Sequence, residues 1–143
     1  MRRPIELYLL LLTSCAVSNP WVSQTIAAGD LAFDSTRVCF HSAEAHPVLV
    51  FEIIHTADKV EGFLSLKRFR FTANPISVQL TLNGESFQEE VPVHEGAMRL
   101  KLSDGLMAHL IQGLQNGQEV GILVDGFKER LTPSQFPVTE RHI

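Results

Sequence analysis

Strict alternation marks the stretch Ile76-Ser77-Val78-Gln79-Leu80-Thr81-Leu82-Asn83-Gly84, which decides the fold class of this chain. Apolar side chains at every second position predict a strand with one face toward a core, and Ser77, Gln79 and Thr81 then face water or a partner. Asn83-Gly84 predicts a two-residue hairpin turn, because both central residues of a type I′ turn need a positive φ. The stretch therefore predicts an antiparallel β-protein.

Short apolar runs separated by turn residues continue this pattern on both sides of the hairpin. They predict strands over residues 37–41, 48–55, 63–71, 97–102, 119–124 and 127–131. The strand that returns after Gly84 places Phe87, Val91 and Val93 inward, and Pro92 makes it an edge strand or a bulged one. Asp125-Gly126 is a second hairpin signal, between the last two strands.

One segment changes the apolar period from two residues to nearly four, and it begins at Ser103. Apolar side chains recur there along one helical face, at Leu106, Met107, Leu110, Ile111 and Leu114. Ser103 or Asp104 can cap the amino end, and Asn116-Gly117 is a typical carboxyl-end stop. The sequence thus predicts a mainly β single domain, a sandwich or open barrel of seven or eight antiparallel strands with one helix near residues 104–115.

The composition is that of a chain with one packed core. Its 143 residues are 45% hydrophobic and include nine Phe, while the formal net charge is −4. This length suffices for one ordinary domain, and the mildly acidic balance argues against nucleic acid as the partner. Cys39 lies in an apolar run, which predicts a small buried hydrophobe; the alternative is a reactive or intermolecular thiol.

The amino-terminal residues have the layout of an export signal. Arg2 and Arg3 precede an apolar run at residues 7–12, and small residues follow. The run is too short to span a bilayer, which takes about 20 apolar residues. The tetrad Leu12-Thr13-Ser14-Cys15 resembles the lipobox of bacterial lipoproteins.

The lipobox resemblance implies diacylglycerol transfer to the Cys15 sulfur, cleavage before Cys15 and acylation of the new amino group, which together make a stable lipid anchor. Lipoproteins of the enterobacterial type stay at the inner membrane when Asp follows the cysteine. Ala16 stands there instead, so the resemblance implies the cell outer membrane, with the domain facing the periplasm. The alternative is ordinary cleavage near Ala28, which leaves a soluble secreted domain.

We therefore expect four regions along the chain. They are a signal peptide at residues 1–14, a lipidated tether without regular structure at 15–29, a β-rich domain at 30–137 that folds on its own, and a flexible tail at 138–143.

The residue types that carry chemistry are present, but not in catalytic patterns. The six His show no metal-binding spacing, and no serine stands in a G-x-S-x-G elbow. No glycine-rich phosphate loop is found either. We expect a protein that is not an enzyme and that needs no metal or cofactor.

One cluster suggests a contact surface. Lys67, Arg68 and Arg70 cluster beside Phe69 and Phe71, so a basic face would back an aromatic one on the predicted strand. Headgroup phosphates or an acidic partner segment would fit such a face, whereas a solvated strand face is the plain alternative.

Two groups of proteins are similar to this chain in overall plan. In length, lipobox and β-rich body it resembles the small lipoprotein pilotins of type III secretion systems. Residues 107–120, with the final strands, loosely resemble the periplasmic invasion-associated locus B proteins. The pilotin resemblance implies a non-catalytic assembly, pilot or targeting factor whose partner is a secretin or another envelope protein. The alternative function is a soluble periplasmic ligand-binding or inhibitor domain.

Overall fold

A computed structural model describes residues 19–26, 35–43, 46–56, 58–94, 96 and 98–137. Nine strands and one helix are assigned within these residues. In chain order they are β1 (Trp21–Ile26), β2 (Ser35–Phe40), β3 (Leu49–His55), β4 (Val60–Leu66), β5 (Ile76–Leu82), β6 (Glu85–Val91), β7 (Arg99–Lys101), α2 (Asp104–Gln115), β8 (Val120–Val124) and β9 (Phe127–Leu131).

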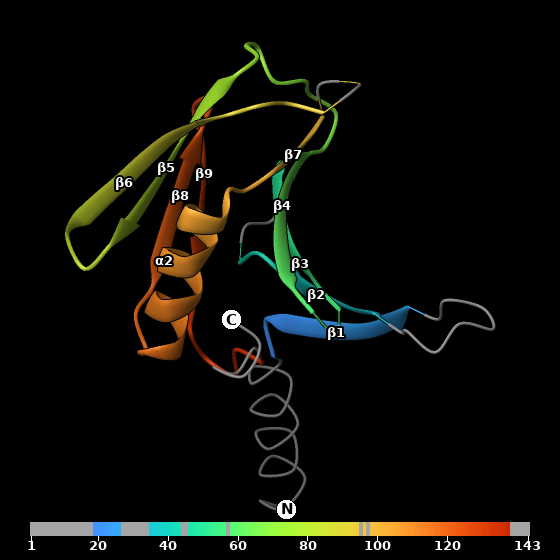
Figure 1. Cartoon of the computed structure of the whole chain (residues 1–143), viewed down its shortest axis with the longest axis vertical. Helices are drawn as coiled ribbons and strands as arrows, with labels where there is room; N and C mark the ends of the chain where they lie inside the picture. Colours follow the sequence, from blue (N-terminus) through green and yellow to red (C-terminus); the bar gives the residue numbers. More distant parts are fainter. Residues whose placement is uncertain are drawn as a thin grey trace, which may run out of the picture.

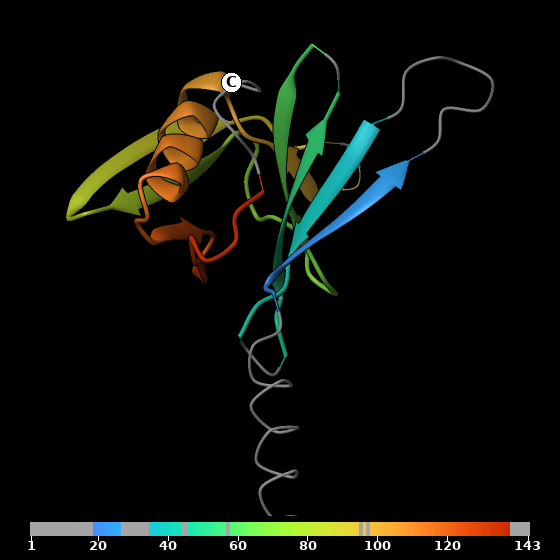
Figure 2. The ribbon, with the colours of Figure 1, turned by 90° about the horizontal axis from the view of Figure 1, so that it is seen from below.

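The strands form two antiparallel sheets. Sheet A has the order β1-β2-β3-β4-β7, and sheet B has the order β6-β5-β8-β9. Figures 1 and 2 show the sheets as separate layers, with α2 against the face of sheet B that turns toward sheet A. The predicted sandwich is therefore confirmed, although the nine described strands exceed the expected seven or eight.

Both predicted hairpin turns are confirmed by the backbone. Asn83 and Gly84 have φ of 48° and 85°, and Asp125 and Gly126 have φ of 52° and 80°. Positive values at both central positions define the type I′ turn, which matches the twist of the flanking strands. These turns fix the β5–β6 and β8–β9 registers, so that Leu82 pairs with Glu85 and Val124 with Phe127.

The predicted helix begins and ends where the sequence indicates. The Ser103 hydroxyl accepts the backbone N–H of Leu106 at 3.1 Å, and Gly117 follows the helix with φ of 77°. The helix is amphipathic, and its buried face carries the expected apolar side chains, Leu106, Met107, Leu110, Ile111 and Leu114. This face packs on β5, β6 and β8 and also contacts β4, so α2 joins the two sheets through their cores.

Strand β1 corrects the predicted tether, because residues 21–26 are not an unstructured spacer. β1 pairs with β2 along its whole length, from Trp21 opposite Phe40 to Ile26 opposite Ser35. Trp21 is only 2% exposed and belongs to the hydrophobic core. A domain starting at residue 30 would therefore lack one strand and one core residue.

Three smaller expectations also change. The strand predicted over residues 63–71 ends at Leu66, so Lys67 to Phe71 belong to a loop. Val93 forms only an isolated bridge to Leu100 beyond β6, which is an edge strand as Pro92 indicated. Cys39 is half-buried on the outer face of sheet A rather than in the core, with its Sγ 3.9 Å from a carboxylate oxygen of Glu52.

Candidate functional site

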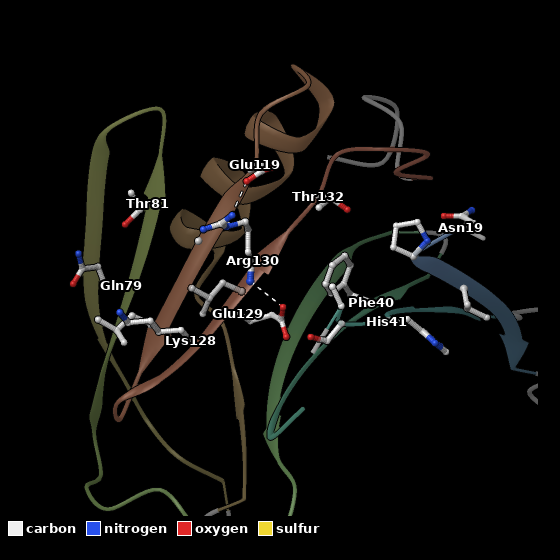
Figure 3. Close-up of a pocket in the computed structure, with 17 residues that line it drawn as sticks. Asn19, Phe40, His41, Gln79, Thr81, Glu119, Lys128, Glu129, Arg130 and Thr132 are labelled. Atoms are coloured by element: carbon white, nitrogen blue, oxygen red, sulfur yellow. Dashed lines mark hydrogen bonds and ion pairs between the residues drawn. The ribbon is translucent and has the colours of Figure 1, made fainter. Parts of the chain in front are cut away.

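A cavity of about 1160 Å³ opens between the end of the β1–β2 pair and strand β9. Sheet A contributes residues at the start of β1 and the end of β2, including Pro20, Phe40 and His41, while sheet B contributes β9 and the neighbouring parts of β5 and β8. We call this cavity the β9 cleft (Figure 3). Most of the sheet B lining, including Gln79, Lys128 and Arg130, lies on the outer face of that sheet, so the cleft extends from the space beside Phe40 around the edge of β9.

Trp21 contacts two residues that line the β9 cleft, Phe40 and Thr132. Its indole Nε1 donates a hydrogen bond to the carbonyl oxygen of Thr132 at 2.8 Å. Its ring packs against Phe40 and Phe136, with centroid distances of 4.8 and 4.9 Å. The backbone N–H of His41 donates to the carbonyl of Pro20, which holds the start of β1 to the end of β2. The wall formed by sheet A is therefore fixed in place.

The opposite wall is the free edge of β9. The two-residue turn makes Val124 and Phe127 a hydrogen-bonded pair, so Phe127, Glu129 and Leu131 direct their backbone groups toward β8. By the same alternation, Lys128 and Arg130 direct their N–H and C=O groups away from β8. β9 is the last strand of sheet B, and both residues line the β9 cleft.

A carboxylate projects into the same space. Register places Glu129 opposite Ile122, on the inner face of sheet B, where it is 9% exposed. One carboxylate oxygen accepts the backbone N–H of Arg130 at 2.9 Å. Among the described residues no Lys, Arg or His side chain forms an ion pair with Glu129, since the Arg130 side chain turns instead to Glu119. Figure 3 shows the Glu129 carboxylate directed toward Phe40 across the cleft.

The basic cluster predicted from the sequence lies elsewhere. Lys67, Arg68 and Arg70 are exposed in the loop between β4 and β5, and Arg68 has φ of 71°. Phe69 is 48% exposed and its ring lies 5.5 Å from that of Phe127. The structure thus brings the basic residues together on a loop, not on a strand face.

This loop is held to the domain by side-chain hydrogen bonds. Asp125 accepts the backbone N–H and the hydroxyl of Thr72, at 2.9 and 2.7 Å. The Asn74 side chain accepts the backbone N–H of Val93 at 3.0 Å. Figure 1 places the loop at the end of the molecule opposite to the start of β1.

The outer face of sheet A carries a charged network centred on Glu52. Its carboxylate accepts hydrogen bonds from Arg37 at 2.5 Å and from Arg99 at 2.9 Å, and its side chain is only 9% exposed. The Arg99 guanidinium also lies over the Phe63 ring, 4.1 Å from its centre. The hydrogen bond and the charge of Glu52 raise the pKa of Arg37. Each charge in this network is compensated, which is typical of structural ion pairs.

A second network on this face involves Glu61. Lys101 lies 2.5 Å from one oxygen of this carboxylate, and Lys59 lies 3.5 Å from the other. The hydrogen bond from Lys101 is the main cause that lowers the pKa of Glu61, and the same contact raises the pKa of Lys101.

The described histidines do not converge on one another. His109 stacks on Phe87 with centroids 3.8 Å apart, whereas His41 lies at the rim of the β9 cleft. Within the described ranges, no group of three or more His, Cys, Asp or Glu side chains is arranged to hold a metal ion. In the same part of the chain, no helix combines the length and the apolar character that a membrane span requires.

Cys15, the predicted lipidation site, lies outside the described residues, as do residues 1–14 and 138–143. The β9 cleft itself was not predicted, although one signal for it is present in the sequence. Parity in the last strand places Glu129 between the inward residues Phe127 and Leu131, and a charged residue at an inward position marks a site that needs a partner.

Comparisons with known proteins return no match: no family model fits this chain, and neither a curated protein nor a solved structure is significantly similar to it.

Proposed function

We propose that this protein is a non-catalytic binding module that holds an extended segment of a partner protein in the β9 cleft. The observation that carries the proposal is the free edge of β9 inside the cavity. A strand edge offers a row of N–H and C=O groups, and an added peptide strand satisfies them. The side chains that line the cleft would then select among partners.

The opposite edge of sheet B is less suited to this role. β6 carries Glu85, Glu89 and Glu90, and Pro92 follows its end. Charged residues and proline are common devices that keep an edge strand from pairing with another chain. β9 lines a cavity instead, where a bound segment would lie beside Phe40 and His41 of sheet A.

We place the module at the outer membrane as a lipid-anchored assembly, pilot or targeting factor. The lipobox-like tetrad supports this location, and the burial of Trp21 supports cleavage before Cys15 rather than near Ala28. Cleavage near Ala28 would remove β1, and with it the ring that packs on Phe40 and Phe136.

An anchor at Cys15 would also orient the domain. Four residues span at most about 14 Å, so Asn19 would lie close to the bilayer surface. The loop with Lys67, Arg68 and Arg70 is at the far end of the molecule in Figure 1. In this orientation the loop points toward the periplasm, and its charges favour an acidic partner segment over lipid headgroups. A secretin or another envelope protein is the partner that fits this arrangement.

The second candidate is a soluble periplasmic ligand-binding or inhibitor domain. The volume of the β9 cleft favours it, because a cavity of about 1160 Å³ is large enough for a small ligand. The inner faces of both sheets pack around α2, and their side chains form the hydrophobic core rather than a binding cavity. The lining residues Glu119, Lys128 and Arg130 instead favour a polar or charged occupant.

Site-specific photo-crosslinking in cells tests the proposed binding role. A photoreactive amino acid at His41 or Lys128, both exposed at the cleft, should capture the same envelope protein. The matched control is Gln88, which is exposed on the outer face of β6. Identical products from all three positions, or none from the two cleft positions, would contradict the proposal.

The anchor is tested with Cys15→Ser, which removes the sulfur that takes the diacylglycerol. We expect the variant to leave the outer-membrane fraction and to accumulate as precursor or soluble protein. Cys39→Ser is the control, because this side chain lies on the outer face of sheet A and should not affect fractionation. An outer-membrane location and processed size unchanged by Cys15→Ser would mean that Leu12 to Cys15 is a chance match.

A further inference from the structure

We propose that the segment bound in the β9 cleft carries a lysine or arginine side chain whose cationic group pairs with Glu129. This inference rests on the proposed binding function of the cleft and adds the chemistry of the occupant. Two independent observations carry it, the environment of Glu129 and the direction of the free backbone groups of β9.

The first observation is a carboxylate with incomplete compensation. Glu129 is nine-tenths buried, and its one hydrogen-bond donor in the described structure is the backbone N–H of Arg130. Removing a carboxylate from water is costly unless a positive group and further hydrogen bonds compensate it. Glu52, which is 6% exposed against 9% for Glu129, differs in that two arginines, Arg37 and Arg99, bind its carboxylate.

The cations closest in sequence do not supply this compensation. Lys128 and Arg130 have the opposite parity to Glu129, so their side chains leave the other face of sheet B. Arg130 pairs with Glu119 at 3.5 Å, which keeps its guanidinium on that face. A positive group that pairs with Glu129 would therefore approach from the side of the cleft that faces sheet A.

The second observation defines the shape of the occupant. The N–H of Lys128 and the C=O groups of Lys128 and Arg130 point out of sheet B, while the N–H of Arg130 is already bound to the Glu129 carboxylate. An extended peptide backbone can pair with these groups as an added strand. Alternate side chains of such a strand would face inward beside Glu129, toward Phe40 of sheet A.

A lysine or arginine side chain, with an aliphatic stem and a cationic head, matches the surroundings of Glu129. Phe40 and Ile122 provide apolar surface in the cleft, and the Glu129 carboxylate provides the counter-charge. Lysine and arginine side chains bury their methylene stems along apolar surface while their charged heads reach a polar group. A free amine without a peptide backbone would leave the edge groups of β9 unpaired.

The test uses a set of fluorescent peptides of about seven residues, alternating threonine and valine, that differ only at the central position. That position is arginine, lysine, the neutral arginine analogue citrulline, or glutamate. Dissociation constants are measured by fluorescence anisotropy with the full-length mature protein. We expect the arginine and lysine peptides to bind about tenfold more tightly than the citrulline peptide, and the glutamate peptide to bind most weakly.

Three variants of the protein test whether Glu129 and the edge of β9 bind the peptide. Glu129→Gln should make the arginine and citrulline peptides bind equally, while Glu90→Gln, which alters an exposed carboxylate on the outer face of β6, should keep the preference. Lys128→Pro should weaken all peptides, because it removes an outward N–H that β8 does not use. Thermal unfolding of each variant confirms that the fold is retained.

The outcomes separate this inference from the proposed function. If Lys128→Pro weakens binding but charge at the central position has no effect, the cleft binds strands and the role of Glu129 is overturned. If the preference survives in Glu129→Gln, the cation binds elsewhere and the inference is also overturned. If no peptide binds, or Lys128→Pro weakens none of them, strand addition at β9 is itself contradicted, and the inference falls with it.

Discussion

The indole Nε1 of Trp21 donates a hydrogen bond to the carbonyl oxygen of Thr132, 2.8 Å away and 111 positions later in the chain. This contact joins the first described strand of sheet A to the residue that follows the last strand of sheet B. It makes β1 part of the folded domain and lies next to the β9 cleft, which Thr132 lines.

We expect Trp21→Phe to lower the free energy of unfolding by about 1 kcal/mol, because it removes the hydrogen bond to Thr132 but keeps an aromatic ring. Trp21→Ala should cost about 3 to 5 kcal/mol, since it also empties the space between Phe40 and Phe136. Urea denaturation measures both values. A protein starting at Gly29 should be destabilised at least as much as Trp21→Ala. Equal stability of that truncated protein and the wild type would show that β1 is dispensable.

Glu52 should matter more for stability than either of its arginine partners. Glu52→Gln leaves Arg37 and Arg99 without their shared counter-charge, and we expect a loss of about 1 to 2 kcal/mol, reduced because both arginines are partly exposed. Arg37→Met should cost less, because Arg99 still binds the carboxylate. A double-mutant cycle in urea denaturation measures the coupling between Glu52 and Arg37. A coupling energy of zero would mean that the pair is not formed in solution.

Gly113 allows α2 to approach β5 closely. A Cβ at this position would overlap Leu82 Cδ2, so Gly113→Ala should lower the free energy of unfolding by about 1 to 3 kcal/mol. Gly105→Ala is the matched control, because it lies in the exposed first turn of the same helix and should gain up to about 1 kcal/mol in helix propensity. Adding Leu82→Ala should relieve part of the defect of Gly113→Ala. A stabilising Gly113→Ala would contradict the packing of α2 on β5.

The contact between Glu61 and Lys101 should make stability depend on acid pH. Lys101 lowers the pKa of Glu61, so the folded state holds its proton less tightly than the unfolded state does. The pair therefore stabilises the fold above the ordinary carboxyl pKa, and this contribution is lost as the pH falls through the lowered folded-state pKa.

At neutral pH we expect Glu61→Gln to lower the free energy of unfolding by less than about 1 kcal/mol, and the difference from wild type should vanish in acid. Glu90→Gln, on the exposed outer face of β6, should leave the acid dependence unchanged. A Glu61→Gln difference that stays constant with pH would refute the assignment.

Local signals explain which parts of the fold the sequence could predict. Ile76–Leu82 and Asp104–Gln115 have the predicted bounds because periodicity, turn residues and caps act within a few positions of one another. β1 was missed because Ser23, Gln24 and Thr25 are exposed and give no apolar alternation. Its place in the fold depends on Trp21, whose partners Phe136 and Thr132 lie more than a hundred positions away.

The candidate site was harder to predict for the same reason. The basic cluster at Lys67, Arg68 and Arg70 is contiguous in sequence and was recognised, but the early end of β4 moves it from a strand to a loop. The β9 cleft combines Pro20 and Phe40 from one sheet with Glu129 from the other, and only the tertiary structure brings them together.

The central claim, that a partner strand adds to β9, is tested most directly by amide hydrogen exchange followed by NMR. The probe is the alternating peptide with central arginine, added at saturation to the isotope-labelled mature protein. We expect the amide of Lys128 to become strongly protected, while the amide of Gln88, on the free edge of β6, exchanges at the same rate with and without the peptide. The amide of Glu129 provides an internal reference, because it is directed toward β8 in both states. Unchanged exchange at Lys128, or protection of Gln88 in its place, would contradict strand addition in the β9 cleft.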